Sequence, residues 1–87
     1  MDRKRLWRQA NALKEQGHRA RNTQNWQQAI SAYQAAYALY ARINVRSLQA
    51  CMFAELGFIA RITGQLAEAR DYYKQALALK PTSSDLI

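Results

Sequence analysis

The chain has 87 residues, of which 49% are hydrophobic and 22% are charged, and its net charge at neutral pH is +7. This length fits one small domain, and the composition is unlike that of disordered or collagen-like chains. One cysteine, Cys51, and one histidine, His18, exclude a disulfide framework and a zinc site built from these residue types. No apolar run approaches the roughly 18 residues of a transmembrane helix. No apolar stretch follows the charged start of the chain, so no signal peptide and a cytoplasmic location are expected.

The positive charge is concentrated in the first 21 residues, which hold seven basic and two acidic side chains. A basic patch is predicted at their start, formed by Arg3, Lys4, Arg5 and Arg8. Such a patch attracts nucleic acid, anionic lipid or an acidic protein surface, and it can also be a solvated face that only keeps the chain soluble.

The first predicted helix covers about 3–22. Asp2 is a suitable N-cap, and small and apolar residues then recur every three or four positions, as in one helical stripe: Leu6, Ala10, Leu13, Gly17 and Ala20. The polar run 22–25 interrupts this pattern, and Asn25 can cap a second helix over about 26–43. The inner side of that helix combines aromatic, aliphatic and small residues: Trp26, Ala29, Ile30, Tyr33, Ala36, Tyr37 and Tyr40.

Two further helices are predicted after the polar break at Asn44. The third covers about 45–63 and ends before Gly64, which suits the left-handed residue that often closes a helix. The fourth covers about 66–80, and Pro81 stops it. No strand-like alternation of polar and apolar residues occurs. The sequence therefore predicts an all-α fold with four helices.

The sequence repeats itself with a period of 40 residues. This shift aligns residues 9–39 with 49–79 without a gap and gives twelve identities, including Gly17 with Gly57 and Tyr33 with Tyr73. Each copy holds two of the predicted helices. The chain is therefore expected to form two tandem antiparallel hairpins in a single domain over 1–81, with repeat one at about 6–43, repeat two at about 45–81 and a short tail at 82–87.

Gly17 and Gly57 each lie within a predicted helix, where glycine costs roughly 1 kcal/mol relative to alanine. A glycine at the same position of both copies indicates that two helices pack so closely there that a side chain would hold them apart. Tyr33 and Tyr73 are expected in the core and at the hairpin interface.

The second copy carries residues that resemble the tetratricopeptide repeat. Leu-Gly and a small residue on its first helix are followed by a loop glycine, and then by alanine, an aromatic residue, alanine and proline: Leu56, Gly57, Ala60, Gly64, Leu66, Ala69, Tyr73, Ala76 and Pro81. The first copy departs from this pattern, because Gln16 replaces the leucine, Gln24 replaces the loop glycine and no proline closes it. The period of 40 residues is similar to the longer-helix variety found in kinesin light chains and in many bacterial regulators.

The resemblance implies an α-solenoid that acts as an adaptor or scaffold, without enzyme activity or cofactor. The concave face of such a solenoid, lined by the first helix of each hairpin, would hold a peptide or helix of a partner protein. Transferred position by position, the lining residues are Asn11, Lys14, His18 and Arg21 from one hairpin and Cys51, Ala54, Phe58 and Arg61 from the other. Trp7 and Arg3 extend this face, since both fall within about 40° of Lys14 on a helical wheel. An acidic and apolar partner segment is expected.

Arg21 and Arg61 occupy the same position of the two copies, and we attribute this recurrence to contact with the partner segment. The alternative is that they pair with Glu15 and Glu55, six residues earlier, which is a poor offset on one helix. Glu55 also argues against the carboxylate clamp with which some tetratricopeptide proteins bind a peptide C-terminus. It stands where that clamp would have an asparagine, and its charge would repel a carboxylate.

Individual residues allow more than one interpretation. Trp7 either caps the end of the hairpin or anchors a partner. His18 is expected at the groove surface, and Cys51 is expected to be a small, buried or half-buried packing residue. The acidic and nucleophilic side chains are not spaced for acid–base or nucleophilic catalysis, and neither a metal site nor enzyme activity is predicted.

Two further kinds of partner are considered. Nucleic acid, bound through the Arg/Lys-rich first helix, is the alternative to a protein partner. Self-association through the fourth helix is also predicted, because two repeats are fewer than solenoids usually contain and should leave apolar surface exposed. The side chains expected to supply this surface are Tyr40, Tyr72, Leu77 and Leu79.

Overall fold

The computed structural model describes residues 2–79, which form four helices. They are α1 (Arg3–Asn22), α2 (Trp26–Arg42), α3 (Arg46–Ile62) and α4 (Leu66–Leu79). No strand occurs between residues 2 and 79, so the all-α prediction is confirmed. The predicted helix boundaries agree to within one residue over this part of the chain. The predicted stop at Pro81 and the tail 82–87 lie outside the described residues.

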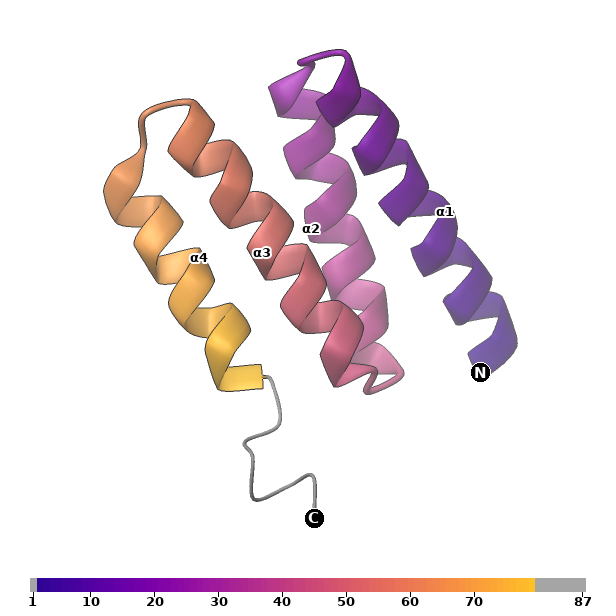
Figure 1. The fold of residues 1–87 in the computed structure, drawn as a ribbon. Coiled ribbons are helices and arrows are strands. Elements are labelled where there is room, and N and C mark those ends of the chain that lie inside the picture. The colour runs from indigo at the N-terminus through magenta and orange to yellow at the C-terminus, as the bar shows by residue number, and fades with distance from the viewer. Residues whose placement is uncertain (1, 80–87) are drawn as a thin grey trace.

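The four helices form two antiparallel hairpins that stand side by side (Figure 1). In the first hairpin α1 packs along α2, and in the second α3 packs along α4. The contact between α2 and α3 joins the two hairpins. Each helix therefore packs against the next one along the chain, which is the arrangement of a helical solenoid.

The three turns between helices share one geometry, in which a residue with left-handed backbone closes the helix. The φ angles of Gln24, Asn44 and Gly64 are 62°, 59° and 83°. The next residue of each turn donates its N–H to a carbonyl five positions earlier, over 2.8 Å from Asn25 to Ala20, 3.0 Å from Val45 to Tyr40 and 2.7 Å from Gln65 to Ala60. The sequence indicates this conformation only at Gly64, because side chains other than glycine adopt it at a cost.

Side chains cap the first two helices as predicted. The Asp2 carboxylate accepts a hydrogen bond from the Lys4 N–H at 3.0 Å. The Asn25 side-chain carbonyl accepts one from the Gln28 N–H at 3.4 Å. Both contacts satisfy backbone donors that have no partner within the helix.

Close contact between glycine and tyrosine holds each hairpin together. A Cβ atom placed on Gly17 would lie 2.6 Å from Cε1 of Tyr33, and one placed on Gly57 would lie 3.0 Å from Cε1 of Tyr73. Tyr33 is fully buried, because α1 and the second hairpin enclose it, whereas Tyr73 is half-buried. The predicted close approach at both glycines is confirmed.

An aromatic cluster bridges three of the helices. The ring of Tyr37 on α2 lies 4.4 Å from that of Phe53 on α3, measured between centroids. Phe53 in turn lies 6.2 Å from Tyr72 on α4. This cluster packs the junction of the two hairpins. Tyr72 is half-buried, so the prediction that it keeps apolar surface exposed is only partly met.

Two burial predictions are wrong. Tyr40 is expected among the exposed apolar side chains but is fully buried, because its hydroxyl and ring contact Asn11 and Trp7 of α1, which agrees with its predicted place on the inner side of the second helix. Cys51 is exposed, because the two buried stripes of α3 turn other residues toward α2 and α4 and leave position 51 on a third side. The prediction for the fourth helix is confirmed at Leu77, which is 67% exposed, while Leu79 is half-buried.

The Gly17–Tyr33 contact can be tested by adding one methyl group. Gly17→Ala should lower the free energy of unfolding by about 1 kcal/mol or more, because overpacking against a ring that cannot move outweighs the gain in helix propensity. Gly57→Ala is the matched control. It should be close to neutral, since the half-buried Tyr73 ring can shift. Urea unfolding followed by circular dichroism measures both, and an equal effect of the two substitutions would contradict the role given to Tyr33.

Candidate functional site

The predicted groove residues of the first hairpin lie along one stripe of α1. Trp7, Asn11, Lys14, His18 and Arg21 follow one another by four and three residues, which keeps them on one side of the helix. We call this stripe, together with Phe58 and Arg61 on α3, the α1/α3 face. Three of its members, Asn11, His18 and Arg21, form hydrogen bonds within the chain.

Two tyrosines of α2, Tyr40 and Tyr33, contact side chains of this stripe through their hydroxyl groups. The Tyr40 hydroxyl donates a short hydrogen bond to the side-chain carbonyl of Asn11. The Trp7 ring meets Tyr40 edge to face, with the centroids 6.0 Å apart. Trp7 nevertheless remains 40% exposed. It therefore packs on the end of the hairpin and also presents aromatic surface, so both interpretations of this residue have a basis in the structure.

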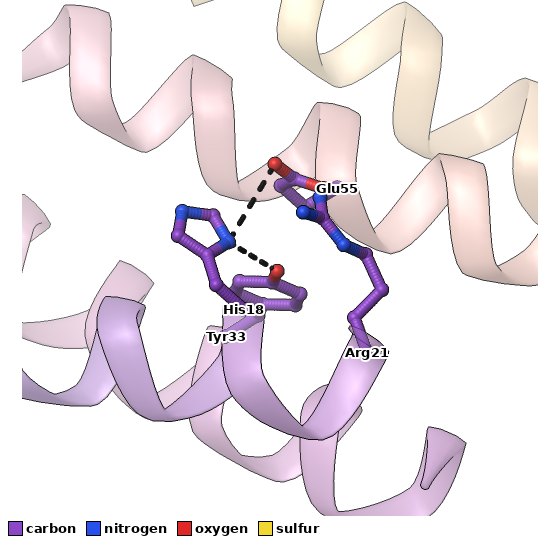
Figure 2. Close-up of polar contacts among 4 residues, drawn as sticks. All are labelled: His18, Arg21, Tyr33 and Glu55. Carbon is purple, nitrogen blue, oxygen red and sulfur yellow. Dashed lines mark hydrogen bonds and ion pairs between the residues drawn. The ribbon is translucent and has the colours of Figure 1, made fainter. Parts of the chain in front are cut away.

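A polar cluster joins the first hairpin to the second, and Figure 2 shows its four members. His18 Nδ1 lies 2.6 Å from the Tyr33 hydroxyl and 3.9 Å from Oε2 of Glu55. Arg21 on α1 donates a hydrogen bond of 2.6 Å to Oε1 of Glu55 on α3. Since Arg21 and Glu55 are only 28% and 24% exposed, this ion pair is partly shielded from water.

The buried position of Tyr33 affects its ionisation. Burial raises the pKa of the Tyr33 phenol from 10.0 to about 12, and the nearby carboxylates of Glu55 and Glu15 add to the increase, while Arg21 opposes it. The phenol therefore stays protonated at neutral pH and shares a hydrogen bond with His18. Burial also raises the pKa of Tyr40.

Arg21 and Arg61 have different surroundings despite their common repeat position. Arg21 binds Glu55 of the other hairpin, so this arginine has a structural role that the sequence interpretation did not include. Arg21 does not pair with Glu15, which lies six residues earlier on the same helix. Arg61 is exposed, and its guanidinium carbon lies 5.6 Å from the centroid of the half-buried Phe58 ring.

Other positive charges of this region have no acidic partner among the described residues. Lys14 lies half-exposed between Asn11 and His18 on the stripe and takes part in no ion pair there. The same holds for the predicted basic patch, whose side chains are all exposed: Arg3, Lys4, Arg5 and Arg8. Their charges are therefore not neutralised by a carboxylate within residues 2–79.

A hollow lies where the basic patch meets the aromatic stripe. It is lined by Arg3, Lys4, Trp7 and Ile43. The sequence placed Arg3 and Trp7 on the groove face but did not associate Ile43 with them, because Ile43 belongs to the turn after α2, 36 residues further along the chain. The hollow combines an apolar floor with two cations.

Neither a cluster of metal-ligating side chains nor a membrane-spanning helix is found in residues 2–79. No group of three or more His, Cys, Asp or Glu side chains within this range could hold a metal ion. Within the same range, no helix is long and apolar enough to cross a membrane.

These features define the class of protein as a helical-repeat protein, in which residues 2–79 form two hairpins packed in chain order through turns of one geometry. A profile of the tetratricopeptide repeat matches residues 8–82. The chain belongs to the tetratricopeptide repeat family, whose repeats generally mediate protein–protein interactions and are generally non-catalytic. Neither a curated protein nor a solved structure matches it.

The raised pKa of Tyr33 predicts how stability depends on pH. The unfolded chain loses the phenol proton near pH 10 and the folded chain only near pH 12. The stabilisation is therefore complete below pH 10 and is lost as the pH rises toward 12, at a cost of about 2 kcal/mol. Urea unfolding across this range should show a steeper loss for the unmodified protein than for Tyr33→Phe. Identical pH profiles for the two proteins would contradict the prediction.

Proposed function

We propose that the protein is an interaction module that binds an acidic and apolar segment of a partner protein along the α1/α3 face. The observation that carries the proposal is the set of unpaired cations beside exposed aromatic surface. Arg3 and Lys4 flank Trp7 at one end, and Lys14 lies further along the stripe. Arg61 over Phe58 supplies a second pair of a cation and an aromatic ring on α3.

The polar contacts beneath this face support a pre-formed surface. Asn11 and His18 are held by the hydroxyls of Tyr40 and Tyr33, and Arg21 is held by Glu55. Side chains that are already ordered lose less conformational entropy when a partner binds. Because Glu55 neutralises Arg21, we expect the acidic residues of the segment to lie against Lys14 and Arg61 rather than against Arg21.

Nucleic-acid binding is the second candidate, since Arg3, Lys4, Arg5 and Arg8 are exposed and unpaired within the described residues. Binding to phosphates would weaken steeply with salt and would not depend on Trp7 or Phe58. A segment that also buries apolar side chains would keep part of its affinity at high salt. The salt dependence of binding therefore separates the two candidates.

Self-association through α4 would add to this function. A particle with two α1/α3 faces could engage two segments of one partner, and the second contact would then be favoured by its high effective concentration. Binding at each single face does not require this arrangement.

The proposal is tested with a displayed library of random short peptides. Selected peptides should be enriched in Asp or Glu together with Leu, Phe or Trp. Lys14→Glu with Arg61→Glu should weaken their binding about tenfold or more, since each charge-assisted contact contributes roughly 1.5–3 kcal/mol when shielded and less when wet. The folded structure should persist, because neither side chain takes part in an ion pair in the described structure.

A matched control carries the same change of charge elsewhere. Arg19→Glu with Arg46→Glu alters two exposed arginines away from the α1/α3 face and should leave peptide affinity within about twofold. Enrichment of basic peptides, or equal weakening by both double substitutions, would show that overall charge and not this face governs binding.

A further inference from the structure

The outer side of α4 carries an exposed stripe with apolar ends. Leu66 and Leu77 are 66% and 67% exposed, and between them lie the exposed Arg70 and the half-buried Tyr73. These four residues are separated by four, three and four positions, so they share one side of the helix. We call them the α4 stripe. Leucines with this much exposed surface at both ends of one stripe mark a candidate interaction surface.

The 40-residue register shows what covers the same stripe in the first hairpin. The equivalent residues of α2 are Trp26, Ile30, Tyr33 and Tyr37. All four are buried or half-buried, and Tyr37 packs on Phe53 of α3. The α4 stripe is therefore the surface against which the next helix of a solenoid would pack. No helix within residues 2–79 packs against it.

The opposite edge of the protein does not fit this surface. Helix α3 has a second buried side besides the one that packs on α4. It is formed by Gln49, Met52, Leu56 and Ile59. Forty positions earlier, on α1, stand Gln9, Ala12, Gln16 and Arg19, and all four are exposed. A second copy that stacked head to tail would bury the polar side chains of Gln16 and Arg19 against Leu77, which is unfavourable without partners.

Two-fold pairing of the α4 stripe avoids that cost. Its spacing of four, three and four reads the same in both directions, so an antiparallel pair with its axis between Arg70 and Tyr73 is self-complementary. In this pair Leu66 of one copy faces Leu77 of the other, and Arg70 faces the ring of Tyr73. The first contact joins apolar side chains, and the second joins a cation to an aromatic face.

We propose that the protein forms a homodimer through the α4 stripe, with the two α4 helices antiparallel. The inference is independent of peptide binding, because none of the residues of the α4 stripe belongs to the α1/α3 face. The dimer turns its two α1 helices outward, with Gln9, Gln16 and Arg19 in contact with solvent.

The first experiment measures mass as a function of concentration with the full chain. Sedimentation equilibrium between about 1 and about 500 µM should show a transition from the 10.0 kDa monomer to a dimer, and the melting temperature should rise over the same range. Leu77→Glu should raise the dissociation constant about a hundredfold, because every dimer loses two leucine contacts. Helix content should be retained, since Leu77 is exposed in the monomer.

The control is Ile62→Glu, which makes the same change at an exposed apolar residue outside the stripe. It should leave the dissociation constant within about threefold, since Ile62 does not lie on the α4 helix. A monomer at every concentration overturns the proposal. Equal loss with Ile62→Glu also overturns it, because association would then reflect unspecific apolar contact.

The second experiment tests the antiparallel register by disulfide trapping. Cys51 is exposed and is first changed to Ser. In that background, Leu66→Cys combined with Leu77→Cys should yield a covalent dimer on mild oxidation, because the two positions face each other across the axis. Either cysteine alone should give little dimer, since identical positions of the two copies lie about 16 Å apart along the helices. Equal trapping by the single variants would contradict the proposed pairing.

Discussion

The packing of Tyr33 is the constraint on which the rest of the structure depends. Its ring fills the place that Gly17 leaves open, and this contact sets how closely α1 approaches α2. The ring is fully buried because the second hairpin lies on its other side. Tyr73 repeats the contact at Gly57 but remains half-buried, because no described helix covers the outer side of α4. The tyrosine at this repeat position thus packs the two helices of its own hairpin together, and it also forms part of the surface against which the next hairpin packs.

The hydroxyl of Tyr33 connects this packing to the face that we propose for binding. It shares a hydrogen bond with His18, whose ring lies near Glu55, and Glu55 holds Arg21. The side chains between α1 and α3 are therefore ordered by the same contacts that join the hairpins. This order leaves Lys14 as the unpaired cation of the stripe, and a surface that is organised before binding loses less entropy when a partner arrives. Fold and proposed function share these residues.

The sequence predicts those features that depend on local or periodic patterns. The helices, their caps and the close contacts at Gly17 and Gly57 all come from residues a few positions apart or from the 40-residue register. The pairing of Arg21 with Glu55 does not, because it joins residues 34 positions apart on helices that are not sequence neighbours. The exposure of Cys51 was missed for a related reason: α3 packs on both α2 and α4, so a single stripe does not describe which of its sides are buried.

The junction of the two hairpins is tested most directly by a double-mutant cycle on Arg21 and Glu55. Free energies of unfolding are measured by urea for Arg21→Ala, Glu55→Ala, the double variant and the unmodified protein, at one low protein concentration. Since the ion pair is partly shielded and spans 2.6 Å, the two substitutions should be coupled by about 1 kcal/mol. Losses that simply add would contradict the account, because the two side chains would then act independently and would not hold the hairpins together.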